Sequence, residues 1–204
     1  MSEPAARLFL ATPPGIGAGL AVSCLKAARA AGDVACLLVR ADEDGGHDEA
    51  LARGLIEAGQ AGGVAVVIED DAALASRLGA DGVHVTSGAR AAGAAREMLG
   101  EEAIVGGECR GKRHEAMDLG LAGIDYLALD QRLEAGGENM LDWWVEMFVI
   151  PVVALHPAAP GAARDLARRG ADFILPGAAM WESPERAAHI IAETMTAIGG
   201  GETS

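Results

Sequence analysis

The stretch that decides the fold is Leu78-Gly79-Ala80-Asp81-Gly82-Val83-His84-Val85. It joins the end of a helical pattern to a run of strand-forming residues, and its glycine stands where only glycine takes the left-handed helix-ending conformation cheaply. The same pattern returns twice, as Ala122-Gly123-Ile124-Asp125-Tyr126-Leu127-Ala128-Leu129 and as Gly170-Ala171-Asp172-Phe173-Ile174-Leu175. Three such joints, with room for one further strand between successive copies, indicate a repeated β/α architecture.

Eight short apolar runs, each bounded by Gly, Pro or polar residues, are predicted as strands buried on both faces. They are 7–12, 34–40, 64–69, 82–85, 103–109, 126–129, 151–155 and 173–175. Helices are predicted at 17–31, 47–58, 71–78, 89–99, 112–119, 141–148, 160–169 and 184–198. Alternating units of this kind favour parallel strands, and eight of them favour a single (β/α)8 TIM barrel of the α/β class. The polar segment 131–140 makes the sixth unit the weakest and leaves an open doubly wound sheet as the alternative.

Composition limits the classes of partner. The chain has 204 residues, half of them hydrophobic, so we expect one domain over 1–204 with short flexible tails at about 1–5 and 199–204. A formal net charge of −14 would repel nucleic acid and anionic membrane surfaces, and we expect neither as a partner. Scattered cysteines, no signal-peptide pattern and no long apolar run predict a cytoplasmic protein with reduced thiols. Homo-oligomer formation is left open.

Two charged groups follow predicted strands at the end of a barrel where chemistry gathers. Arg40 ends the second strand, and its guanidinium could meet a phosphate or pair with nearby Asp42 or Asp44. Glu69-Asp70-Asp71 follow the third strand and offer the oxygen ligands that Mg²⁺ takes alongside substrate phosphates. The alternative is that one aspartate caps the helix that begins directly after it.

The last strand is followed by Pro176-Gly177-Ala178-Ala179. Small residues let backbone N–H groups approach an anion, and loops at this point of a barrel often form a phosphate site. A tight turn chosen for packing is the alternative. His84, between two valines within a strand, is expected to be a packed and hydrogen-bonded core residue and not a ligand.

Residues 64–85, Val-Ala-Val-Val-Ile-Glu-Asp-Asp-Ala-Ala-Leu-Ala-Ser-Arg-Leu-Gly-Ala-Asp-Gly-Val-His-Val, resemble the third-to-fourth-strand region of thiamine-phosphate synthases and their thiazole tautomerase relatives. The similarity continues through Ile104-Val105-Gly106, Asp125-Tyr126, Pro151-Val152-Val153-Ala154 and Gly170-Ala171-Asp172, from about 34 to 191. It implies a (β/α)8 fold and Mg²⁺-assisted coupling of a pyrimidine diphosphate to a thiazole phosphate, which gives thiamine phosphate and pyrophosphate.

The resemblance also implies roles for individual residues. Arg40 would contact the pyrimidine diphosphate and Asp70 would bind Mg²⁺, which makes these two the catalytic candidates. The backbone of Gly177, Ala178 and Ala179 would supply donors to a phosphate. The expected partners are therefore phosphorylated small molecules.

At other positions the chain departs from the pattern that the resemblance implies. The second metal-binding aspartate falls on or near Ala89, the serine after the fifth strand falls on Glu108, and a phosphate-binding Gly-Gly falls on His156-Pro157. Asp130 could replace the missing metal-binding aspartate. Negative charge at 108 and 130 would push away dianionic groups.

These departures leave three hypotheses for the function. The first is a divergent thiamine-phosphate synthase-like enzyme. The second is a paralogue on the same scaffold that lacks synthase activity and acts as a small-ligand binding or regulatory protein. The third is an enzyme of different chemistry, since a fold does not determine a reaction.

Overall fold

Strands and helices alternate along the chain in the computed structural model, which describes residues 6–155 and 160–199. The strands are β1 (Arg7–Ala11), β2 (Val34–Val39), β3 (Ala65–Glu69), β4 (Gly82–Val85), β5 (Ile104–Cys109), β6 (Tyr126–Leu129), β7 (Glu134–Ala135), β8 (Glu138–Asn139), β9 (Val152–Ala154) and β10 (Phe173–Ile174). The helices are α1 (Ala18–Ala31), α2 (Glu49–Gln60), α3 (Ala72–Leu78), α4 (Ala89–Leu99), α5 (Arg113–Leu121), α6 (Met140–Met147), α7 (Pro160–Arg168), the 3₁₀ helix η1 (Ala178–Trp181) and α8 (Pro184–Gly199).

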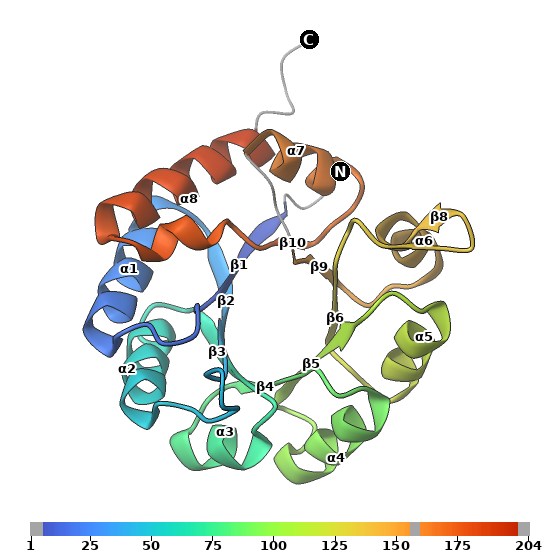
Figure 1. Cartoon of the computed structure of the whole chain (residues 1–204), viewed down its shortest axis with the longest axis horizontal. Coiled ribbons are helices and arrows are strands. Elements are labelled where there is room, and N and C mark those ends of the chain that lie inside the picture. Colours follow the sequence, from blue (N-terminus) through green and yellow to red (C-terminus); the bar gives the residue numbers. More distant parts are fainter. Residues whose placement is uncertain (1–5, 156–159, 200–204) are drawn as a thin grey trace.

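Eight parallel strands close into a barrel in the order β1-β10-β9-β6-β5-β4-β3-β2, and the α-helices surround it (Figure 1). Closure is complete because β1 pairs with β2 on one side and with β10 on the other. The predicted (β/α)8 TIM barrel is confirmed, and the open doubly wound sheet is wrong. Within the described residues no helix is long and apolar enough to cross a membrane.

The αβ joints have the backbone that their sequence predicts. Gly79, Gly123 and Gly170 all have positive φ, at 73°, 80° and 89°, a region that a side chain makes costly. Each glycine ends a helix and turns the chain back toward the barrel. The predicted strand between successive joints is also present, as β5 and as β9.

The aspartate of each joint holds the neighbouring strand by two hydrogen bonds. The backbone N–H of Val66 on β3 donates to the Asp81 carboxylate at 2.7 Å, and the Asp81 N–H donates to the Val66 carbonyl at 2.8 Å. The same reciprocal pair joins Asp125 to Val105 and Asp172 to Val152. The carboxylate thus satisfies a backbone N–H at the rim of the barrel and aligns one strand against the next.

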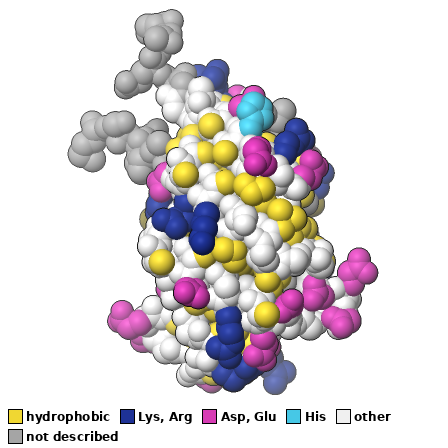
Figure 2. All heavy atoms as spheres, turned by 90° about the vertical axis from the view of Figure 1, so that its left-hand side faces the viewer, with side chains coloured by type: hydrophobic (Ala, Val, Ile, Leu, Met, Phe, Trp, Pro, Cys, Tyr) yellow, Lys and Arg dark blue, Asp and Glu magenta, His cyan; other side chains and the backbone are white. Residues whose placement is uncertain are grey.

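Side chains inside the barrel form a core of their own, which includes Phe9, Leu38, Val67, Tyr126 and Val153. Two further apolar clusters lie between the strands and the surrounding helices. On the outer surface of the part formed by α1, α2 and α8, acidic, basic and hydrophobic side chains are interspersed (Figure 2). The helices therefore bury their apolar faces against the strands, as an α/β barrel requires.

The sixth unit differs most from its prediction. Part of the segment 131–140 forms an antiparallel pair, β7 with β8, before α6 begins at Met140. Asn139 caps α6 by accepting from the Leu141 N–H at 3.0 Å. Polar and glycine-rich residues in this segment therefore form a short hairpin and a helix cap. Our predicted tails, apart from residue 199, and the pair His156-Pro157 lie outside the described residues.

We expect Asp81→Ala to lower the free energy of unfolding by about 1–3 kcal/mol, because the Val66 N–H then loses a charged acceptor. Urea denaturation of the two proteins measures this difference. Asp81→Asn is the matched control, since its amide oxygen still accepts, and it should lose less. Equal stability of Asp81→Ala and the unchanged protein would contradict a structural role for this bond.

Candidate functional site

A central cavity of about 170 Å³ opens at the C-terminal ends of the barrel strands. Most of its wall is apolar, and three charged side chains face it. The lining residues are Ala11, Leu38, Arg40, Glu69, Glu108, Leu155 and Leu175. They come from strands all round the barrel, so closure of the sheet creates this site.

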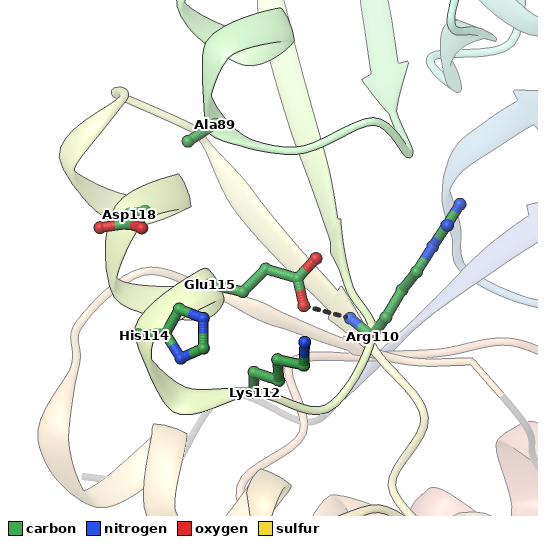
Figure 3. Close-up of a pocket in the computed structure, with 6 residues that line it drawn as sticks. All are labelled: Ala89, Arg110, Lys112, His114, Glu115 and Asp118. Atoms are coloured by element: carbon green, nitrogen blue, oxygen red, sulfur yellow. Dashed lines mark hydrogen bonds between the residues drawn. The ribbon is translucent and has the colours of Figure 1, made fainter.

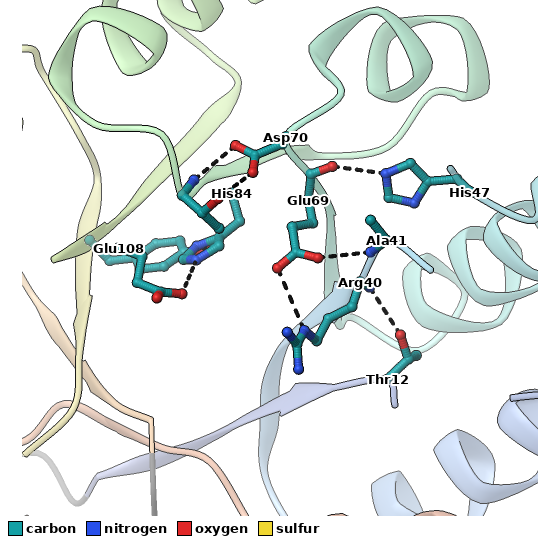
Figure 4. Close-up of polar contacts among 10 residues, drawn as sticks. Thr12, Arg40, Ala41, His47, Glu69, Asp70, His84 and Glu108 are labelled. Carbon is teal, nitrogen blue, oxygen red and sulfur yellow. Dashed lines mark hydrogen bonds and ion pairs between the residues drawn. The ribbon is translucent and has the colours of Figure 1, made fainter. Parts of the chain in front are cut away.

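Arg40 and Glu69 form an ion pair at the mouth of the cavity (Figure 4). The Arg40 Nε lies 3.5 Å from Glu69 Oε1, and the other Glu69 oxygen accepts from the Ala41 N–H at 2.8 Å. Glu69 is buried and Arg40 is half exposed. The predicted alternative partners were wrong, because Asp42 accepts from the Gly15 N–H and Asp44 from the Gly46 N–H. Glu69 therefore already balances the charge of Arg40.

Asp70 sits at the end of β3 with φ of 49°, the positive-φ residue other than glycine among those described. Such backbone strain is concentrated at functional sites. The carboxylate accepts from the Thr86 N–H at 2.8 Å, from the Thr86 hydroxyl, and from the Ser87 hydroxyl at 3.3 Å. The neighbouring Asp71 caps α3 by accepting from Leu74, so the predicted capping role is confirmed for Asp71 and leaves Asp70 at the mouth.

A buried polar chain runs from inside the barrel to the cavity. His84 is 1% exposed, and its Nδ1 lies 2.9 Å from the Tyr126 hydroxyl. Its Nε2 lies 3.8 Å from the Glu108 carboxylate (Figure 4), which is too long for a hydrogen bond. His84, and less strongly Arg110 and Arg40, lower the pKa of Glu108 against the opposing effect of burial. His84 is a packed core residue, as predicted, and it also supports Glu108.

The remaining predicted residues lie at other strand ends. Asp130 follows β6, where its carboxylate accepts from Arg132 Nε at 2.8 Å and Nη2 at 2.6 Å. Gly177 precedes η1, and Gly177 and Ala178 are exposed while Ala179 is half-buried. Asp70 and Asp130 are separated by β4 and β5 in the barrel. Their assignment to substrate or metal stays a prediction.

The donor set fits a shared metal ion better than a resident one. No group of three His, Cys, Asp or Glu side chains that could hold a metal occurs among residues 6–155 and 160–199. Asp70 does supply one hard carboxylate at the mouth, close to the hydroxyls of Thr86 and Ser87. Mg²⁺ commonly takes one or two carboxylates and completes its shell with water and substrate phosphate oxygens.

A second pocket, of about 340 Å³, lies outside the ring of strand ends, beside α5 (Figure 3). Its lining mixes three basic and two acidic side chains with one alanine: Ala89, Arg110, Lys112, His114, Glu115 and Asp118. Glu115 turns inward and accepts from the Arg110 N–H at 3.1 Å. The pocket thus places basic groups next to the central cavity, in a protein that is acidic overall.

Comparison with known proteins agrees with the predicted resemblance. Residues 8–179 match the family model described as thiamine monophosphate synthase. The chain belongs to this family. It is 36% identical to thiamine-phosphate synthase from Rhodospirillum centenum over 92% of this chain and 95% of that protein, and 34% identical to the one from Hyphomonas neptunium over 88% and 87%. The solved thiamine phosphate pyrophosphorylase from Pyrococcus furiosus has the same fold, with a TM-score of 0.77, 19% identity and coverage of 95% and 96%.

In this member of the thiamine monophosphate synthase family, sequence reasoning missed the link between three site residues. Glu69 was considered only as part of an acidic run, Glu108 only as a departure from the expected serine, and Tyr126 not at all. Alternation along β5 carried a signal, because Gly106 and Glu108 have the same parity and face the interior together. A Cβ at Gly106 would overlap the Tyr126 phenol, so this glycine provides the space through which Tyr126 reaches His84.

Tyr126 allows a clean spectroscopic test, because it is the single tyrosine of the chain. Burial raises its pKa well above 10.0, so the folded protein keeps a proton that the unfolded chain loses near pH 10. Stability is therefore retained below about pH 10 and lost as the pH rises further. We expect tyrosinate absorbance at 295 nm to appear only together with alkaline unfolding. Titration near pH 10 in the folded protein, as in a guanidinium-unfolded sample, would contradict the buried hydrogen bond.

Proposed function

We propose that this protein is a thiamine-phosphate synthase, which couples a pyrimidine diphosphate to a thiazole phosphate and releases pyrophosphate. The observation that carries the proposal is the 36% identity to the R. centenum synthase over nearly the full length of both chains. The placement of Arg40, Asp70 and the small residues 177–179 at one end of the barrel supports it. All of them follow strands at the catalytic end of this fold.

The chemistry requires stabilisation of the negative charge on the departing pyrophosphate. Asp70 is the residue that would hold Mg²⁺, and the ion would supply positive charge to the phosphate oxygens. Arg40 would add a guanidinium beside it, shared with Glu69. The exposed backbone at Gly177 and Ala178 would donate to a phosphate group, and Asp130 remains the second proposed metal ligand.

The partners in this proposal are phosphorylated small molecules in the cytoplasm. Cys24, Cys36 and Cys109 are free thiols, which supports a reducing compartment. A homo-oligomer remains part of the sequence-based expectation.

A second candidate is a barrel of the same family that binds a small ligand without synthase activity. The observation in its favour is electrostatic, because Glu69 neutralises Arg40 and Glu108 adds a further negative charge to the cavity. A dianionic group would be repelled from such a lining. The two candidates differ in turnover, which a direct assay measures.

Asp70→Asn should reduce formation of thiamine phosphate by about 100-fold or more, because the metal and the leaving group lose their carboxylate anchor. Asparagine tolerates the left-handed backbone of this position and retains an acceptor for Thr86, so folding should be preserved. The assay combines the purified protein with both substrates and Mg²⁺ and measures the product. Glu57→Gln, on the exposed face of α2, is the control and should be fully active.

Absence of product from the unchanged protein, above a control without protein, would reject the synthase proposal in favour of the second candidate. Full activity of Asp70→Asn would reject the role of Asp70 and leave the reaction itself intact.

Inorganic pyrophosphate with Mg²⁺ should raise the melting temperature by about 5 °C or more at a hundredfold excess over Kd. The shift should shrink in Asp70→Asn and in Arg40→Gln, because each variant removes one contact to the anion. Thermal denaturation with and without the ligand measures this effect. An undiminished shift in both variants would place the anion site elsewhere, with the basic pocket beside α5 as the next region to test.

A further inference from the structure

The buried imidazole of His84 has one nitrogen whose hydrogen-bonding capacity is unused. Its Nδ1 is engaged by the Tyr126 hydroxyl at 2.9 Å. Its Nε2 is buried without a hydrogen-bond partner and faces the Glu108 carboxylate at 3.8 Å. A buried polar atom in this condition is costly. The proposed synthase reaction gives His84, Tyr126 and Glu108 no role, so their arrangement needs a separate explanation.

The charges around the central cavity do not balance. Its lining contains one cation, Arg40, and two anions, Glu69 and Glu108. Arg40 lies against Glu69, and that glutamate is further anchored by the Ala41 N–H. Glu108 instead lies between the buried imidazole and the open cavity, with 30% of its side chain exposed. This carboxylate is therefore the acceptor available to a ligand that enters from the mouth.

The shape of the cavity limits what that ligand can be. Leu38, Leu155 and Leu175 form apolar walls around the charged groups. The volume of about 170 Å³ is smaller than the ~300–1,000 Å³ of pockets that bury drug-sized ligands. A single flat ring that carries an N–H donor matches both the walls and the carboxylate, and a phosphate attached to it would remain at the rim.

We infer that Glu108 is the specificity-determining residue of the central cavity, that Tyr126 and His84 position it, and that it accepts a hydrogen bond from the amino group of a nitrogen heteroaromatic ring. The Tyr126 hydroxyl sets the orientation of His84, and His84 holds Glu108 toward the cavity. The identification of the ring as the pyrimidine of the substrate rests on the proposed function and deepens it. Recognition of the amino group does not depend on turnover.

Discrimination is the property to measure. Isothermal titration calorimetry would compare 4-aminopyrimidine with unsubstituted pyrimidine, neither of which carries a phosphate. We expect the unchanged protein to bind the amino compound at least ten times more tightly. Equal affinities for the two rings would overturn the inference, and so would equal affinity for butylamine, which has an amino group but no ring.

Variants separate Glu108 from the residues that position it. Glu108→Gln should reduce the preference for the amino compound by about tenfold, because an amide oxygen is a weaker acceptor than a carboxylate. Tyr126→Phe keeps the ring in the core and should reduce the same preference without changing the affinity for pyrimidine. Glu146→Gln, on the exposed face of α6, is the matched control and should bind like the unchanged protein.

Circular dichroism and urea midpoints would establish that each variant is folded, and the comparison of two rings on the unchanged protein stands even if a variant fails. A preference that survives in folded Glu108→Gln would overturn the inference. Selective binding without synthase turnover would reject the proposed function and keep the inference. Turnover without ring selectivity would do the reverse.

Discussion

The reciprocal pair of hydrogen bonds between a joint aspartate and the preceding strand is the interaction on which this barrel depends. Asp81, Asp125 and Asp172 each bind both backbone groups of one residue on the neighbouring strand. A parallel strand that begins at the rim of a barrel would otherwise leave a backbone N–H without a partner. The left-handed glycine before each aspartate brings the carboxylate into position. One short sequence pattern therefore ends a helix, starts a strand and aligns it with its neighbour.

Alignment at one end of the barrel determines what meets at the other. Gly106 pairs with both His84 and Tyr126 across adjacent strands, and its missing side chain leaves the space in which the phenol reaches the imidazole. Two residues further along β5, the same parity brings Glu108 to the cavity. A change of register by one residue would turn these side chains away from the interior. The electrostatics of the mouth thus depend on the backbone pairing below it.

Much of this structure could be predicted because its causes are local. The apolar runs, the left-handed glycines and the capping of α3 by Asp71 each follow from a few neighbouring residues. The sixth unit was harder, because β7 and β8 are only two residues each and carry no apolar periodicity. For Arg40, sequence proximity suggested Asp42 or Asp44, whereas the partner is Glu69 on the adjacent strand. Such a partner is chosen by strand order, which no local pattern contains.

The sequence by itself determined the family, the closed barrel and the strand ends at which Arg40 and Asp70 stand. Those features depend on short-range conformational preferences and on a pattern repeated along the chain. Only the tertiary structure decided that Glu69 balances Arg40 and that Tyr126 reaches His84 beneath Glu108, residues that lie 42 positions apart in the first contact. Contacts of this kind arise from closure of the sheet, which brings distant strand ends around one cavity. The joint pattern is consequently clearest about the scaffold, while the chemistry of the mouth is set by which side chains that scaffold turns toward one another.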